Sequence, residues 1–334
     1  MNPVFIIAEI AQAHEGSLGI AHSYIDALAN TGVDAVKFQT HIADAESSEY
    51  EQFRVNFSYE DKTRFDYWKR MEFTAEQWAG LKEHCEEKGM EFISSPFSIA
   101  AVELLERIGV KRYKIGSGEM TNYLMLQKIA ETGKPIILSS GMSDLTELDE
   151  TISFLRKWEN PLSLLQCTTA YPTQPEEWGL QMIQFLKERY KMPVGFSDHS
   201  ANIFAGLAAV TLGAEILEFH VVFNHEMFGP DAKASLTLEQ TKSLVDGVRS
   251  IEKSLKVDYL KDDVGKFIEL KTLFGKSLTT KRAVKAGEIV TINDLESTKP
   301  GNKGISAKYF QQIVGKKWVA DFPGHHFIKE QDIV

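Results

Sequence analysis

Through the first 222 residues of the sequence, short apolar segments alternate with amphipathic helical patterns. Each apolar segment ends in polar or glycine residues, which is typical of strands buried on both faces of a parallel sheet. Eight such strand and helix pairs predict a (β/α)8 TIM barrel, a fold of about 250 residues. An open doubly wound sheet is the alternative, but the uniform alternation favours closure. We expect the strands at residues 4–10, 35–39, 91–95, 112–116, 135–139, 162–167, 194–197 and 216–219.

Two helix starts and one long insertion mark the barrel segment. Capping boxes that begin at Thr74 and Thr237 predict helices after the second and the eighth strand. Residues 41–71 form a charged stretch between the second strand and its helix. Because a loop of this length is usually functional, we expect it to act as a lid or to contribute to a binding site.

The C-terminal part of the chain has a different pattern. Short β-like runs at residues 277–280, 289–290 and 318–320 are separated by glycine and proline turns. A β-rich module of this size is marginal by itself and is expected to dock on another surface. We therefore predict a barrel at residues 1–254, a linker at 255–274 and a small β-rich domain at 275–334.

The composition indicates a globular protein from a reducing compartment. Apolar residues make up 43% and charged residues 25% of the chain, and no apolar run approaches the roughly 20 residues that span a bilayer. The two cysteines give no disulfide framework, and a strand follows Met1 closely, so we expect a cytoplasmic protein without a signal peptide. The net charge of −10 arises from an acidic barrel segment, which argues against nucleic acid as a partner.

Two predicted strands end in histidine. His199 follows the seventh strand and His220 ends the eighth, with one helix between them. A parallel βαβ unit places the two strand ends side by side, where two imidazoles could bind one divalent metal. The alternative is that each histidine is only hydrogen-bonded near the surface.

Lysines and hydroxyls gather at the other strand ends. Lys37 and Lys114 lie within apolar strands, and a buried lysine needs an anionic partner. Hydroxyls add neutral donors, so these ends could hold a small, multiply charged anion. The hydroxyl residues are Ser95, Ser117, Ser139, Thr169 and Ser197.

Two carboxylates accompany them. Glu9 lies in the first strand and Glu119 follows the fourth. They could supply acid–base chemistry or bind substrate hydroxyls. Equally, they could serve only as salt-bridge partners of Lys37 and Lys114.

Taken in order, these strand ends resemble the sialic acid synthase family, which condenses phosphoenolpyruvate with N-acetylated sugars. The tail resembles the family's antifreeze-like (SAF) domain, through the Lys285-Ala286-Gly287-Glu288 turn and the run from Lys299 to Asn302. The matching barrel runs are His14-Glu15-Gly16-Ser17, Lys37-Phe38-Gln39-Thr40, Ser94-Ser95-Pro96-Phe97, Lys114-Ile115-Gly116-Ser117-Gly118-Glu119, Ser139-Ser140-Gly141-Met142, Tyr171-Pro172, Ser197-Asp198-His199 and Gly229-Pro230-Asp231.

The resemblance implies a role for each matching residue. His199 and His220 would bind manganese or magnesium. Our own hypothesis for this reaction makes Glu9 and Glu119 the catalytic carboxylates, with Glu9 handling the protons of water and Glu119 orienting the sugar. The implied product is a nine-carbon 2-keto sugar acid, made from an acceptor such as N-acetylmannosamine in a domain-swapped homodimer. Phosphoenolpyruvate would contact Lys37, Ser95, Lys114, Ser117, Ser139, Thr169 and Ser197, and the sugar would contact Gln39, Glu119, Tyr171, Asp231 and, from the partner's tail, Lys299.

Three positions depart from the family pattern. Lys299 stands where an arginine usually reaches the sugar's acyl group, and a lysine cannot provide the planar two-pronged donor. Thr169 and Ala13 replace frequent asparagines. The alternatives are therefore a legionaminic or pseudaminic acid synthase, another phosphoenolpyruvate-aldose synthase, or a carbohydrate-binding or ice-binding protein on the same scaffold.

Overall fold

The structure, a computed structural model, describes residues 2–53, 55 and 57–334. The chain divides into two compact units, Met1–Val257 and Asp258–Val334. Each unit has its own hydrophobic core. The two units are described separately below.

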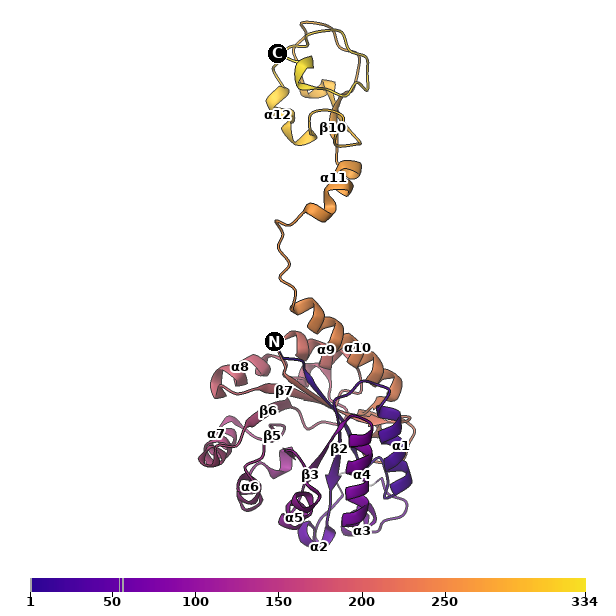
Figure 1. The fold of residues 1–334 in the computed structure, drawn as a ribbon, viewed down its shortest axis with the longest axis vertical. Coiled ribbons are helices and arrows are strands. Elements are labelled where there is room, and N and C mark those ends of the chain that lie inside the picture. The colour runs from indigo at the N-terminus through magenta and orange to yellow at the C-terminus, as the bar shows by residue number, and fades with distance from the viewer. Residues whose placement is uncertain (1, 54, 56) are drawn as a thin grey trace. The chain divides into compact units, whose positions relative to one another are not determined.

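The first unit is a nearly closed barrel of eight parallel strands, in the order β3-β2-β1-β8-β7-β6-β5-β4, with β3 and β4 side by side at the seam (Figure 1). All eight strands lie where the sequence predicts them, and the fold class is confirmed. A short strand, β9 (Leu236–Thr237), adds to the end of β8. The barrel strands are β1 (Phe5–Ala11), β2 (Ala35–Thr40), β3 (Glu91–Pro96), β4 (Tyr113–Ile115), β5 (Ile136–Ser139), β6 (Leu162–Cys167), β7 (Val194–Asp198) and β8 (Ile216–Val222).

Helices surround the strands on the outside of the barrel (Figure 1). Capping boxes at Thr74 and Thr237 begin α4 and α10, as predicted, with each threonine side chain accepting the backbone N–H three residues later. Within the described residues, no helix combines the length and apolarity needed to cross a bilayer. The surrounding helices are α1 (Leu18–Leu28), α4 (Ala75–Glu87), α5 (Ile99–Ile108), α6 (Tyr123–Ala130), α7 (Leu145–Leu155), α8 (Gln181–Tyr190), α9 (Phe204–Thr211) and α10 (Leu238–Leu255).

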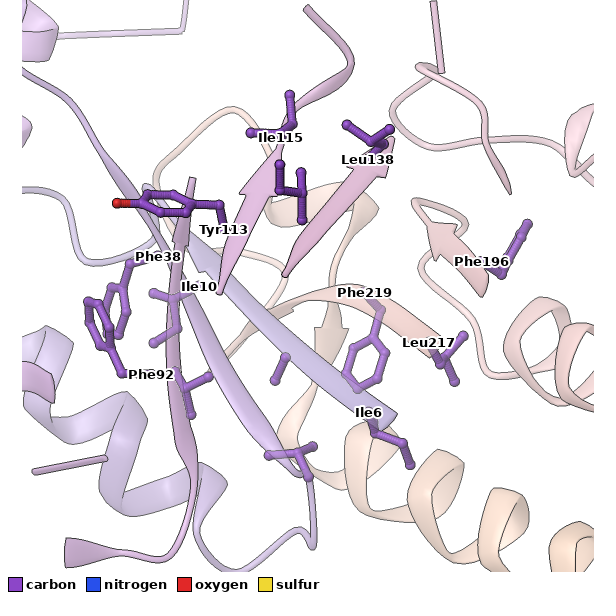
Figure 2. Close-up of a cluster of buried hydrophobic side chains, with 14 of the residues drawn as sticks. Ile6, Ile10, Phe38, Phe92, Tyr113, Ile115, Leu138, Phe196, Leu217 and Phe219 are labelled. Atoms are coloured by element: carbon purple, nitrogen blue, oxygen red, sulfur yellow. The ribbon is translucent and has the colours of Figure 1, made fainter. Parts of the chain in front are cut away.

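Alternate strand residues face two different cores. Outward-facing side chains such as Phe38, Phe92 and Phe219 pack under the helices (Figure 2). The intervening positions point into the barrel, because successive side chains of a strand lie on opposite faces. There they form an apolar plug, consisting of Ile7, Ala35, Ile93, Ile137, Leu165 and Ile216.

Gly195 shows how tightly the plug is filled. A Cβ atom at this position would lie 2.7 Å from both Leu165 Cδ2 and Ile216 Cβ. The backbone of β8 and the side chains of β6 and β8 therefore occupy the space that a side chain on β7 would need. The plug closes one end of the barrel, so any cavity must open toward the other end.

The insertion after β2 is more ordered than the predicted loop. It contains α2 (Ala43–Glu46) and α3 (Arg64–Met71), and a capping box at Thr63 begins α3. Tyr67, Trp68 and Met71 are buried in a small aromatic cluster of their own. The sequence did not reveal these helices because their packing surfaces are too short to show a helical period.

The second unit is small and irregular. It contains α11 (Ile268–Phe274), α12 (Phe310–Ile313) and an antiparallel pair of strands, β10 (Ser277–Thr280) and β11 (Leu295–Thr298). The predicted β-like runs at 289–290 and 318–320 make isolated bridges instead of strands. The core of this unit comprises Leu278, Val284, Val290, Ile313, Trp318, Ile328 and Ile333.

Candidate active site

A polar layer lies directly above the apolar plug. Glu9, Lys37 and Glu218 each follow a plug residue by two positions on the same strand, so they point into the barrel as the plug does. This layer is the floor of a cavity of about 390 Å³ at the carboxyl ends of the strands, where barrel enzymes carry their chemistry. The cavity is lined by Glu9, Lys37, Gln39, Ser95, Lys114, Ser117, Glu119, Ser139, Thr169, Tyr171, Ser197, His199, His220 and Asp231, which are all the predicted site residues except Lys299.

The floor pairs two lysines with two carboxylates. Lys37 Nζ contacts the Glu9 carboxylate and lies 3.8 Å from Glu218. Lys114 Nζ lies 3.1 Å from Glu218, which also accepts a 3.0 Å hydrogen bond from Ser197. Glu9 therefore pairs with Lys37, as the salt-bridge alternative expects, while its catalytic role stays a prediction. Glu218 was missed by the sequence reading, although it interrupts an apolar strand as Lys37 does.

Burial and charge act against each other in this layer. Burial lowers the pKa of Lys37 to about 7, with Glu218 opposing the fall and Lys114 adding to it. Burial alone would raise the pKa of Glu218, but Lys114 and Lys37 outweigh it and hold that pKa below its ordinary value. While both lysines are protonated, the two carboxylates balance their charge.

Hydroxyls converge on the floor from neighbouring strand ends. Ser139 is 1% exposed, and neither its Oγ nor the Oγ1 of Thr169 has a hydrogen-bond partner among the described residues. A Cβ atom added to Gly141 would lie only 2.7 Å from Ser117 Oγ. Residue 141 must therefore lack a side chain for its backbone to lie this close to Ser117. A buried hydroxyl without a partner is costly, which points to a ligand oxygen as the missing partner.

The two predicted metal ligands lie side by side. The ring centroids of His199 and His220 are 5.2 Å apart, and Tyr171 packs against His199 at 4.3 Å. His199 Nδ1 lies 3.0 Å from the Thr168 carbonyl oxygen. Because a carbonyl only accepts, Nδ1 carries the proton and Nε2 keeps its lone pair, as in a metal-binding histidine. His220 Nδ1 lies 4.0 Å from Asp231.

The two imidazoles alone would supply only part of a metal's coordination, so the metal stays a prediction. Within the described part of the chain, no group of three His, Cys, Asp or Glu side chains could enclose a metal. With two imidazoles as ligands, the remaining positions would be filled by water or substrate.

A chain of hydrogen bonds links the floor to the insertion. Gln39 Nε2 donates to Glu9 at 3.2 Å, and Gln12 Nε2 donates to Gln39 Oε1. Gln12 Nε2 also lies 3.1 Å from His41 Nε2, and His41 Nδ1 lies 2.5 Å from Glu46 on α2. His41 was not predicted as a site residue, because its role depends on packing that the sequence does not show.

Glu119 lies apart from the lysines. Its carboxylate accepts a 2.8 Å hydrogen bond from Asn122. Burial raises the pKa of Glu119 above its ordinary value, and the Asn122 hydrogen bond only partly offsets this. The group can therefore carry a proton at a higher pH than an exposed glutamate can.

The insertion contributes one wall of the cavity. His41 stacks between Trp68 and Phe97, with ring centroids 3.9 Å and 4.4 Å away. Arg64 lies over Trp68 and pairs with Glu51 at 3.0 Å. The prediction that residues 41–71 contribute to a binding site is consistent with this arrangement.

Lys299 belongs to the second unit. Its ammonium lies 5.0 Å from the centre of the Phe274 ring. The cavity described above consists of residues from the first unit, so the contact of Lys299 with substrate stays a prediction.

Comparisons with known proteins agree with this architecture. The chain is 34% identical to N,N'-diacetyllegionaminic acid synthase of Campylobacter jejuni, over 99% of this chain and 100% of that one. It is 32% identical to human N-acetylneuraminate-9-phosphate synthase, covering 95% and 89% of the two chains. A crystal structure of the N-acetylneuraminic acid synthetase from Leptospira borgpetersenii, in complex with citrate, matches with a TM-score of 0.71 and 33% identity, over 81% of this chain and 91% of that one.

The family models cover both units of the chain. The NeuB family model matches residues 24–258 and the SAF domain model matches residues 275–334. Together with relatives of similar length and sequence, these matches show that the chain is a member of the NeuB family of sugar acid synthases and carries a C-terminal SAF domain.

Proposed function

We propose that the protein condenses phosphoenolpyruvate with an N-acylated hexosamine, and releases phosphate and a nine-carbon 2-keto sugar acid. The observation that carries this proposal is the floor of the cavity. Two buried lysines lie there beside a pair of histidines, together with two hydroxyls that have no hydrogen-bond partner within the described part of the chain. A small dianion next to a Lewis-acid site is the substrate that such a floor suits best.

The anion would occupy the lysine side of the cavity. Lys114 with Ser117, Ser139, Thr169 and Ser197 would hold the phosphate, because all five line the same cavity and the hydroxyls of Ser139 and Thr169 are the ones without a partner. Lys37 and Ser95, which lie 3.4 Å apart, would hold the carboxylate. The entering anion would replace Glu9 and Glu218 as the partner of each ammonium.

His199 and His220 would hold a manganese or magnesium ion beside this anion site. When bound, such an ion supplies Lewis acidity toward a substrate carbonyl. The imidazoles suit this role because Thr168 fixes the orientation of His199.

The acceptor sugar would bind between Gln39, Tyr171 and Asp231. Carbon 3 of phosphoenolpyruvate then forms the new C–C bond to the aldehyde carbon, whose oxygen becomes a hydroxyl. Glu119, whose pKa burial raises, would orient the sugar and donate that proton. Water adds to carbon 2, and phosphate departs with cleavage of its C–O bond. Glu9 would take the proton from the water.

We also propose that the protein acts as a dimer with exchanged tails. The SAF unit is positively charged on balance, and the barrel segment is acidic, so docking has an electrostatic basis. Lys299 would reach the partner's cavity from a turn rich in glycine and proline.

Phosphate release tests the proposal. The protein with phosphoenolpyruvate, manganese and N-acetylmannosamine or a 2,4-diacetamido hexose should release one phosphate for each nine-carbon acid detected by mass spectrometry. A carbohydrate-binding protein on the same scaffold would bind the sugar and release no phosphate.

A further inference from the structure

The first residue of the insertion, His41, takes part in the chain of hydrogen bonds that ends at the cavity floor. We infer that His41 is a positioning residue for acceptor binding. Through Gln12 it holds the side-chain amide of Gln39 so that an N–H group of that amide faces the sugar. This inference rests on the proposed condensation and concerns a residue that acts through two others.

Two carboxylates fix the ends of this chain. The Glu46 carboxylate lies 2.5 Å from His41 Nδ1, and the Glu9 carboxylate lies 3.2 Å from Gln39 Nε2. An ionised carboxylate can only accept hydrogen bonds. His41 Nδ1 must therefore carry a proton, and Gln39 must turn its amide nitrogen, rather than its oxygen, toward Glu9.

The hydrogens in the middle of the chain follow from these ends. Gln39 turns its Oε1 toward Gln12, whose Nε2 donates to it and also lies 3.1 Å from His41 Nε2. An amide nitrogen carries two hydrogens, so Gln12 can donate to both atoms. Gln39 Oε1 and His41 Nε2, which are 3.2 Å apart, are then both acceptors. A proton on His41 Nε2 would instead face the amino group of Gln12, which is another donor.

Burial and stacking hold the chain in this arrangement. His41 is 4% exposed, and its ring lies 3.9 Å from that of Trp68 and 4.4 Å from that of Phe97 between centroids. Gln12 is 6% exposed, so the donor that links His41 to Gln39 is also removed from water. A buried polar group without a partner is costly. Reversing one member of the chain is therefore opposed, because its neighbours would lose their partners.

The consequence for the sugar lies in the second hydrogen of the Gln39 amide. Gln39 lines the cavity, and its Nε2 gives one hydrogen to Glu9. The other hydrogen can be given to a hydroxyl oxygen of the sugar. Without His41, Gln12 would lose one of its two acceptors and could turn. Gln39 would then no longer be held with its nitrogen toward the substrate.

Two substitutions separate hydrogen bonding from packing at this position. His41→Phe keeps an aromatic ring between Trp68 and Phe97 but removes both ring nitrogens. His41→Gln gives up the ring, but its side-chain oxygen can lie near the position of Nε2 and accept from Gln12. His22→Gln makes the same change on α1, outside the residues that line the cavity, and serves as the control.

Steady-state kinetics with manganese and saturating phosphoenolpyruvate measure the effect on the sugar. We expect His41→Phe to raise the KM of the acceptor about fivefold, the effect of one hydrogen bond of ordinary net strength. Its kcat should change little, because the lost contact binds the sugar equally in the ground state and the transition state. The dissociation constant of phosphoenolpyruvate, measured by calorimetry, should stay unchanged, since Lys37 keeps Glu9 as its partner. His41→Gln and His22→Gln should both keep the wild-type KM.

The outcomes distinguish this inference from the condensation. A wild-type KM in folded His41→Phe would show that the ring only packs, and equal impairment of His41→Gln would show that stacking matters and the hydrogen bond does not. Either result overturns the inference. Long-range ¹H–¹⁵N NMR of the wild type with labelled histidine identifies the protonated ring nitrogen without any variant having to be active, and a proton on His41 Nε2 would contradict the proposed chain. If the wild type releases no phosphate with any acceptor, the condensation itself is wrong, while the NMR result still tests the chain.

Discussion

Replacing Lys114 with methionine should lower the free energy of unfolding and weaken phosphoenolpyruvate binding. The two effects arise from different contacts. Lys114 Nζ lies 3.1 Å from the buried Glu218 carboxylate. Removing one partner of a buried ion pair costs about 3–5 kcal/mol. Glu218 would keep Ser197 at 3.0 Å and Lys37 at 3.8 Å, so we expect Lys114→Met to lose about 3 kcal/mol of unfolding free energy, the lower end of that range.

The same change should weaken phosphoenolpyruvate binding through a different contact. Losing one charged hydrogen bond to the phosphate costs about 1.5–3 kcal/mol, or one to two decades in dissociation constant. The double variant Lys114→Met with Glu218→Gln removes the unpaired carboxylate charge, and Lys37 keeps Glu9 as its partner. It should therefore regain most of the stability but none of the phosphoenolpyruvate affinity.

Urea unfolding and calorimetric titration with phosphoenolpyruvate measure the two effects on the same proteins. If the double variant regained affinity together with stability, Lys114 would act only by neutralising Glu218 and would not contact the phosphate. If the sugar's affinity fell and that of phosphoenolpyruvate did not, the two halves of the cavity would be transposed.

Four further predictions concern this site and the C-terminal tail. The dissociation constant of phosphoenolpyruvate should rise as the pH increases above about 7, because the free protein then loses the Lys37 proton. Since arginine stays charged, Lys37→Arg should remove most of this pH dependence, as measured by calorimetric titration. His199→Ala should lose manganese-dependent turnover while keeping its melting temperature; undiminished activity of the wild type in chelator would exclude the metal. A chain that ends at Leu273 should keep its barrel by circular dichroism and lose activity. Co-refolding His199→Ala with an inactive Lys299→Ala protein should restore activity if tails are exchanged, and heterodimers without activity would assign each tail to its own barrel.

The barrel could be predicted because its signals are local. Each strand is an apolar run followed by polar residues, and the helix starts at Thr74 and Thr237 carry their own capping partners three residues later. The strand ends meet in any closed parallel barrel. A sequence that shows the ends therefore also shows which side chains share the cavity.

The pairing within the cavity could not be predicted in the same way. Glu218 on β8 pairs with Lys114 on β4 across the barrel, and these strands are not neighbours in the sheet. His41 follows a strand end directly, but its position depends on stacking with Trp68 and Phe97, which come from separate segments. Such contacts depend on tertiary packing, which leaves no period in the sequence.

The fate of the bridging oxygen of phosphoenolpyruvate tests the central claim most directly. With ¹⁸O between carbon 2 and phosphorus, the proposed route releases phosphate that carries the label and a nine-carbon keto acid whose new oxygen comes from water. Mass spectrometry of both products after turnover with manganese and an N-acylated hexosamine measures this. Label retained in the sugar acid, or phosphate released without a nine-carbon product, would contradict the account.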